Sequence, residues 1–211
     1  MTKRSYHGQL PAVIPLRQAL PIGLLCWLPS ISAAGEPDAY PRVYRTFMPE
    51  SGPSAFAVEL SPKLALCYDP LRGGVNRIWT GGINLAPTRL AKINNTAKII
   101  GTEFYRETLE HPLRIGSADA DARYRFKGYR YKKGAVTFEF TLAGQPVTET
   151  LRVTKDGRGL MREFHLSKQA VFSQEKQSNA TVTIRGGREL KPGQWRFAAG
   201  KSIRIVITPK P

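Results

Sequence analysis

Residues 124–166 decide the fold and read YRFKGYRYKKGAVTFEFTLAGQPVTETLRVTKDGRGLMREFHL. In the middle of this stretch, Val136, Phe138, Phe140 and Leu142 alternate with polar residues. A period of two puts successive side chains on opposite faces of a β-strand. Glycine-containing turns separate the apolar runs, and one of them holds the Asp-Gly pair favoured in hairpins. The stretch therefore predicts an antiparallel meander with strands at residues 124–131, 136–142, 147–153 and 160–166.

The same alternation assigns the two faces of these strands. In the last strand of the meander, Arg162 shares its phase with Leu160 and Phe164. The acidic residues of the meander alternate with apolar ones. We therefore expect them to face solvent; they are Glu139, Glu149 and Glu163.

Most of the chain outside the meander shows the same short apolar runs, and helical periodicity is nearly absent. Further strands are expected at residues 43–48, 55–60, 63–68, 75–79, 99–106, 180–184 and 202–208. Residues 80–97 are rich in Gly, Asn, Pro and Thr, which is typical of an irregular loop with one short helical turn. The pattern predicts an all-β fold, an antiparallel two-sheet sandwich that forms a single domain over residues 35–211.

The first 34 residues have the pattern of a secretory signal peptide. Lys3, Arg4 and Arg17 precede an apolar stretch at residues 19–28, and small residues follow up to Ala34. The apolar stretch is too short to span a bilayer, and no later segment reaches that length. We expect cleavage after Ala34, no transmembrane segment in the mature chain and a periplasmic or secreted location. An uncleaved N-terminal anchor is the alternative.

Charge indicates the kind of partner to expect, and the cysteine content limits the disulfides that can form. The chain of 211 residues has 32 basic and 16 acidic residues, a net charge of +16. Loss of the three basic residues before residue 35 leaves about +13, which favours anionic partners. Cys67 is then the only cysteine, so the mature chain has no internal disulfide. Cys67 lies in an apolar run and is expected to be buried.

Catalytic and cofactor motifs are missing from the sequence. It has no Cys-x-x-Cys-His haem motif, no phosphate-binding loop, no zinc-protease motif and no nucleophile elbow. His111 and His165 are interpreted as structural or exposed residues. Asp69 lies in a turn, where an aspartate accepts hydrogen bonds from backbone N–H groups. No catalytic residue, metal site or cofactor is predicted.

The loop after residue 79 is the candidate binding site. An exposed Trp beside Asp, Asn and Arg side chains suits a sugar ring, which stacks on the indole and accepts hydrogen bonds. The candidate ligand-binding residues are Tyr68, Asp69, Arg77, Trp79, Asn84 and Arg89. The alternative for Trp79 is a place in the hydrophobic core.

A second candidate surface combines basic and aromatic residues. Arg and Lys alternate with Tyr and Phe over residues 123–133, a mixture that also occurs in nucleic-acid-binding proteins. On a strand the alternation sends the aromatic residues inward and the basic ones to solvent. Because export also argues against nucleic acid, we expect an anionic polymer of the cell envelope or an acidic protein as the partner of this charge.

Several segments resemble a β-rich domain of secreted, multidomain bacterial c-type cytochromes and related sugar-processing envelope proteins. The resemblance covers residues 41–170 and rests on residues 41–49, 55–60, 67–69, 78–82, 101–106, 112–116 and 126–130. The family pattern has a second cysteine soon after the position of Cys67, whereas this chain has Arg72, Gly73 and Gly74 there. The haem-binding module is also missing. The resemblance implies an accessory domain in a redox or saccharide-processing system.

The sequence as a whole favours an exported, non-catalytic β-sandwich. Its expected partner is a c-type cytochrome or an envelope saccharide. A carbohydrate-active enzyme of the same architecture and a binder of anionic envelope polymers remain the alternatives.

Overall fold

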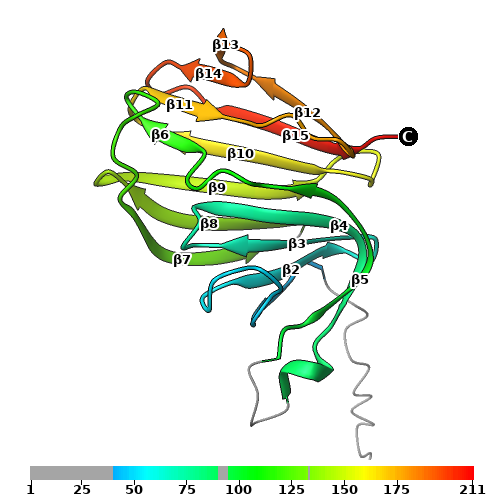
Figure 1. The fold of residues 1–211 in the computed structure, drawn as a ribbon. Coiled ribbons are helices and arrows are strands. Elements are labelled where there is room, and N and C mark those ends of the chain that lie inside the picture. Colours follow the sequence, from blue (N-terminus) through cyan, green and yellow to red (C-terminus); the bar gives the residue numbers. More distant parts are fainter. Residues whose placement is uncertain (1–39, 90–94, 133) are drawn as a thin grey trace, which may run out of the picture. The chain divides into compact units, whose positions relative to one another are not determined.

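Alternating side chains build most of the chain into antiparallel strands in the computed structural model, which describes residues 40–89, 95–132 and 134–211 (Figure 1). Sheet A has the order β1 (Arg42–Arg45), β2 (Phe56–Ser61), β3 (Leu64–Asp69), β4 (Gly74–Asn84) and β5 (Lys98–Arg106). Sheet B has the order β13 (Arg188–Lys191), β14 (Gln194–Phe197), β11 (Ala170–Ser173) and β6 (Leu113–Ile115). Sheet C has the order β12 (Ala180–Arg185), β15 (Ile203–Pro209), β10 (Leu160–Leu166), β9 (Gln145–Val153), β8 (Ala135–Leu142) and β7 (Tyr124–Lys132).

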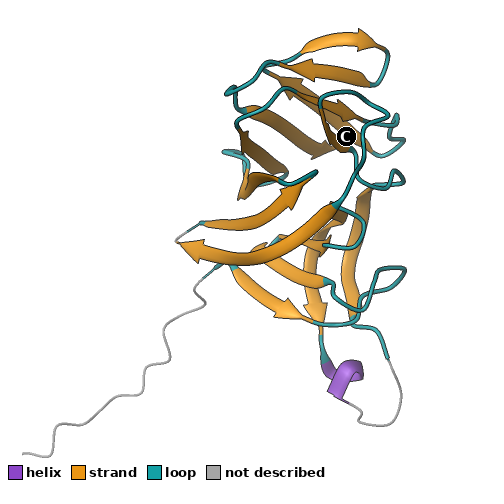
Figure 2. Cartoon of the chain, turned by 90° about the vertical axis from the view of Figure 1, so that its left-hand side faces the viewer, coloured by secondary structure: helices purple, strands orange, loops and turns teal. Residues whose placement is uncertain are grey.

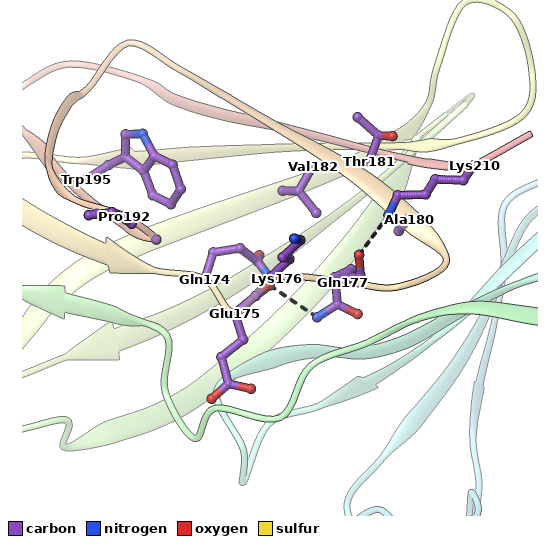
Figure 3. Close-up of a pocket in the computed structure, with 11 residues that line it drawn as sticks. Gln174, Glu175, Lys176, Gln177, Ala180, Thr181, Val182, Pro192, Trp195 and Lys210 are labelled. Carbon is purple, nitrogen blue, oxygen red and sulfur yellow. Dashed lines mark hydrogen bonds between the residues drawn. The ribbon is translucent and has the colours of Figure 1, made fainter.

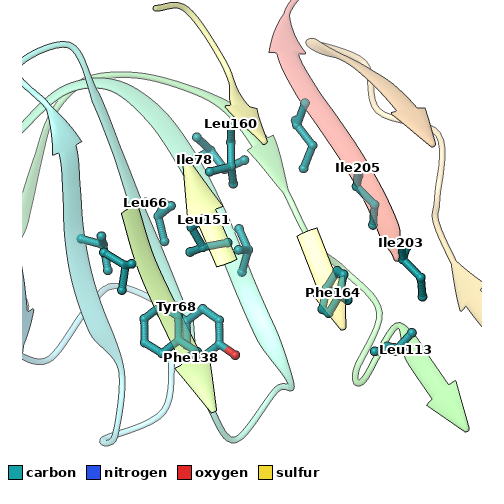
Figure 4. Packing of buried hydrophobic residues seen from close by; sticks show 14 of the residues in the cluster. Leu66, Tyr68, Ile78, Leu113, Phe138, Leu151, Leu160, Phe164, Ile203 and Ile205 are labelled. Carbon is teal, nitrogen blue, oxygen red and sulfur yellow. The ribbon is translucent and has the colours of Figure 1, made fainter. Parts of the chain in front are cut away.

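The core lies on the inner face of sheet C, where both other sheets contribute to one hydrophobic cluster. From sheet A, the ring of Tyr68 stacks on Phe138 of β8 with their centroids 3.6 Å apart. From sheet B, Phe172 packs on Phe164 of β10 at 6.3 Å. Figure 4 shows Tyr68 over Phe138, together with Phe164 and Ile203 further along sheet C. Sheets A and B thus share the second layer of the sandwich, opposite the six strands of sheet C.

A second, smaller core covers the outer face of sheet A. Its members are mostly small residues, together with Met48 and the buried Trp79 and Cys67. The loop before β2 is held against the segment before β5, since the Ala97 N–H donates to the Phe47 carbonyl at 2.8 Å. Burial raises the pKa of the Cys67 thiol to about 12. The prediction of a buried Cys67 is confirmed.

The predicted all-β antiparallel sandwich is confirmed, and the four meander strands are β7 to β10. The structure divides the strands among three sheets, whereas the sequence predicted two. The sequence analysis missed all four strands of sheet B. Those strands have only three or four residues each, too few to display an alternation. The loop at residues 80–97 begins later than expected, since β4 continues to Asn84, and its helical turn is the 3₁₀ helix η1 (Ala86–Arg89), purple in Figure 2.

The prediction that Glu149 faces solvent is wrong. Its side chain is fully buried and its Oε1 accepts a 2.6 Å hydrogen bond from Nε of Arg162, whose inward phase is confirmed. Glu149 shares its phase on β9 with Val147 and Leu151, which are also buried. On β9 the polar residues on either side of Glu149 reach solvent instead. The sequence analysis therefore assigned Glu149 to the wrong face of this strand. Glu139 and Glu163 do lie on the outer side, paired with Arg130 and Arg204 respectively.

The inward direction predicted for the aromatic residues of β7 holds along the strand, because Tyr129 pairs with Phe138 and Tyr131 with Val136, whose side chains are buried, but the burial of these aromatic residues differs. Tyr124 and Phe126 pack against the core, whereas Tyr129 and Tyr131 are 39% and 63% exposed. The register shifts between Phe126 and Gly128, and β7 is the edge strand of sheet C. Beyond this bulge the rings are covered only in part, since Tyr129 packs on Phe56 and Phe138 and Tyr131 packs on Tyr129.

In the part of the chain that the structure describes, no helix is long and apolar enough to cross a membrane. The predicted signal peptide at residues 1–34 lies outside the described residues.

Candidate functional site

The six residues predicted to bind a ligand do not form one surface site. Tyr68 belongs to the core between sheets A and C, and its hydroxyl lies 3.1 Å from that of Tyr124. Trp79 belongs to the separate core on the outer face of sheet A. The two aromatic rings that the sequence placed near one loop therefore lie on opposite faces of the same sheet.

Asp69 and Arg77 are buried and have structural partners. The Asp69 carboxylate accepts hydrogen bonds from the N–H groups of Gly52 and Leu71, at 2.7 and 3.0 Å, which confirms its role in a turn. Arg77 forms ion pairs of 3.2 Å with both Glu50 and Glu103. Both side chains are therefore engaged by partners within the protein.

Trp79 is a core residue, the alternative that the sequence left open. Its side chain is fully buried and its indole N–H donates to the Gly82 carbonyl at 2.9 Å. Asn84 is exposed, and its Oδ1 accepts a hydrogen bond from the Ala86 N–H at 2.9 Å. Arg89 ends the helix η1. The indole therefore presents no ring face to a ligand in this conformation.

A groove at the other end of the chain is the better candidate site. Its volume is about 620 Å³, and it lies between the edge strand β12, the segment after β11 and the turn between β13 and β14 (Figure 3). It is lined by Gln174, Glu175, Lys176, Gln177, Ala180, Thr181, Val182, Pro192, Gly193, Trp195 and Lys210. The strand order brings these parts together, because β12 pairs with the C-terminal strand β15 and β14 pairs with β11.

Trp195 provides the aromatic wall of this groove. On β14 it shares a phase with Phe197, which is buried, so the indole points toward the space between sheets B and C. Trp195 is only partly buried, and Figure 3 shows it facing the groove across from Val182. Ligand sites typically combine such an apolar wall with a few polar groups that orient the ligand. The sequence analysis did not single out Trp195, whose only signal was a large aromatic residue two positions after a Pro-Gly pair.

Hydrogen bonds hold the polar floor of the groove in place. The side-chain amide of Gln174 donates to the Glu175 carbonyl at 2.8 Å, and the Lys210 ammonium donates to the carbonyls of Gln177 and Ser178 at 3.1 and 2.7 Å. Beneath the groove, the Tyr105 hydroxyl donates to Glu107 at 2.7 Å and lies 3.3 Å from Gln174 Oε1. Burial raises the pKa of Tyr105, so this hydroxyl stays protonated.

One groove side chain keeps its hydrogen-bonding group free for a ligand. Lys176 is exposed, and within the described residues it makes no side-chain hydrogen bond or ion pair. Thr181 is also exposed, but it alternates with Ala180 and Val182 on β12, so its hydroxyl points to the other face of the strand. Glu175 is the only carboxylate among the lining residues, and it accepts a short hydrogen bond from the Thr108 hydroxyl. The groove therefore offers an aromatic face and one free ammonium group.

The histidines and the acidic residues form no second site in the described part of the chain. His165 is exposed and lies 3.2 Å from the Ser202 hydroxyl. His111 is partly buried, and burial lowers its pKa, so its ring is neutral at pH 7. Among residues 40–89, 95–132 and 134–211, no group of three His, Cys, Asp or Glu side chains is placed to hold a metal ion. The chain matches no protein-family model, no curated protein and no solved structure.

Proposed function

We propose that this chain is an exported, non-catalytic β-sandwich that binds a saccharide in the groove beside Trp195. The observation that carries the proposal is the partly exposed indole, which faces a groove containing the free ammonium group of Lys176. The apolar face of a sugar ring packs on an indole, and its hydroxyls accept and donate hydrogen bonds at the ring edge. Export is part of the proposal and rests on the pattern of residues 1–34.

Binding is favoured over glycoside hydrolysis. Most glycosidases use two carboxyl groups on either side of the scissile bond. Among the residues lining the groove, Glu175 alone carries a carboxylate, and that carboxylate is hydrogen-bonded to Thr108. The c-type cytochrome expected from the family resemblance remains an alternative partner, and no contact or charge pattern of the groove favours it over a saccharide.

The test is calorimetric titration of the folded protein with neutral cello-, xylo- and manno-oligosaccharides. Trp195→Ala is expected to weaken binding at least tenfold, and Trp195→Phe to retain most of it. Because Trp195 also packs against the core, the variant Lys176→Ala provides a second test that leaves the core intact. It is expected to weaken binding as well, since it removes the free ammonium group from the groove.

Tyr131→Ala is the matched control, because it removes an aromatic side chain that is 63% exposed and lies outside the groove. Its affinity should equal that of the parent. Unchanged affinity in folded Trp195→Ala, or no binding of any neutral oligosaccharide by the parent, would refute the proposal. Release of reducing sugar by the parent that stops in Glu175→Gln would show a hydrolase instead.

A further inference from the structure

The outer face of sheet C carries an unbalanced positive charge. Its side chains alternate with those of the core, so they point away from sheets A and B. Where β7, β8 and β9 lie side by side, the exposed cations are Arg125, Lys127, Arg130, Lys132 and Arg152. The one acidic residue on this part of the face is Glu139, which pairs with Arg130.

A hollow of about 430 Å³ lies within this charged area. It is lined by Arg130, Lys132, Ala135, Thr137 and Arg152. Ala135 is the centre of one row across three strands, because it pairs with Lys132 of β7 on one side and with Arg152 of β9 on the other. Since paired residues in a sheet point to the same side, both cations flank the small alanine side chain.

Lys132 and Arg152 have no acidic partner among the described residues, whereas Arg130 is neutralised by Glu139. Two strand spacings separate Lys132 from Arg152, a Cα distance of about 10 Å. At that separation both long side chains can donate to one oxyanion seated over Ala135. An arginine guanidinium matches two oxygens of sulfate or phosphate at once.

The row of cations continues along β7. Arg125 and Lys127 lie on the same exposed side of this edge strand, beyond Arg130 and Lys132. At about 3.4 Å per residue, the span from Arg125 to Lys132 is roughly 24 Å, which is long enough to meet several charges of a linear polymer. A basic track of this kind holds the backbone of a polyanion rather than one small ion.

We propose that the outer face of sheet C binds a linear polyanionic glycan along β7, with one sulfate or phosphate group held over Ala135 between Lys132 and Arg152. The site is separate from the groove beside Trp195, and its ligand class is distinguished by charge. The tests of this site therefore do not depend on whether the groove beside Trp195 binds neutral saccharides.

The first experiment measures binding of dextran sulfate, with uncharged dextran of the same length as the control polymer. The parent should bind only the sulfated polymer, and binding should weaken as NaCl is added because salt screens exposed charges. Lys132→Gln, Arg152→Gln is expected to lower the affinity at least tenfold. Arg188→Gln, Lys191→Gln removes the same charge from exposed positions on β13 of sheet B and should lower it less than threefold.

Equal losses in the two double variants would overturn the proposal, since binding would then follow net charge alone. Failure of the parent to bind dextran sulfate at low salt would overturn it as well. The second experiment separates a built oxyanion site from a diffuse polymer contact. Sodium sulfate should shift the amide resonances of Ala135 and Arg152 more than sodium chloride at equal ionic strength. Identical shifts in the two salts would refute the proposed sulfate or phosphate site over Ala135.

Discussion

Two arginines are buried in the part of the chain that the structure describes, and their surroundings differ in access to water. Arg77, on the outer side of sheet A, forms ion pairs with Glu50 and Glu103, whose side chains are 64% and 24% exposed. Arg162 lies in the core between the sheets and pairs with Glu149, which is fully buried. The first region keeps its carboxylates partly hydrated, while the second removes both charges from water.

The difference determines how each region depends on its charges. In the core, Glu149 Oε2 and Arg162 Nη1 have no hydrogen-bond partner within the described structure. Burial of an ion pair has a desolvation penalty that its attraction offsets only in part, so loss of one partner is more damaging than loss of both. Near the surface, water replaces a lost partner. Mutations in the two regions should therefore have very different effects.

The largest effect is expected from Glu149→Ala, which leaves the Arg162 guanidinium unpaired in the core. The free energy of unfolding should fall by about 3–5 kcal/mol, measured by urea denaturation. The double variant Glu149→Leu, Arg162→Met should recover most of this loss, because it removes both charges and keeps the volume. A loss below about 1 kcal/mol in Glu149→Ala would mean that water reaches Arg162.

Phe138→Ala provides a comparison with Glu149→Ala, because it removes an apolar side chain from the same core. Phe138 is fully buried and stacks on Tyr68, so the substitution should lower the free energy of unfolding by about 3–5 kcal/mol. The same denaturation experiment measures it. A change within about 0.5 kcal/mol, as at surface positions, would show that the faces of β8 are assigned wrongly.

The pH dependence of stability should reveal the buried carboxyls. Burial raises the pKa of Glu107 above its ordinary value of 4.5. Between 4.5 and the raised pKa, the folded state keeps a proton that the unfolded state releases. Stability therefore falls as pH rises through this window, with a slope of at most about 1.4 kcal/mol per pH unit from this group. Glu107→Gln should remove that part of the slope in denaturation curves from pH 4 to 8, and an unchanged slope would contradict the shift.

The smallest effect is expected from Glu50→Gln at the Arg77 region. Glu50 is mostly exposed and Glu103 remains bonded to Arg77, so the free energy of unfolding should change by less than about 1 kcal/mol. The difference from the parent should shrink further in high salt. A loss of stability as large as that of Glu149→Ala would contradict the expected difference between the surroundings of Arg77 and Arg162.

Local patterns predicted the long strands and most of their faces. Alternation over β8 and β10 identified the inward side chains, including Arg162, because a period of two is a property of the strand itself. The burial of Cys67 was predicted correctly from the continuous apolar run around it, which suits a strand covered on both faces. The phase of Glu149 was also present in the sequence, since Val147 and Leu151 flank it at a spacing of two. Only the position of Arg162 explains why a carboxylate is stable there.

The candidate site came almost entirely from the tertiary structure. Trp79 and Trp195 are both aromatic residues near glycines, and nothing local shows that the first is enclosed while the second lines a groove. The sequence by itself determined an all-β chain, its main strands and its positive charge, which depend on residue type and period. The tertiary structure alone decided the third sheet, the groove beside Trp195 and the row of Lys132, Ala135 and Arg152. Each of these depends on strand pairing between segments far apart in the chain, and side-chain periodicity contains no information about which strands become neighbours.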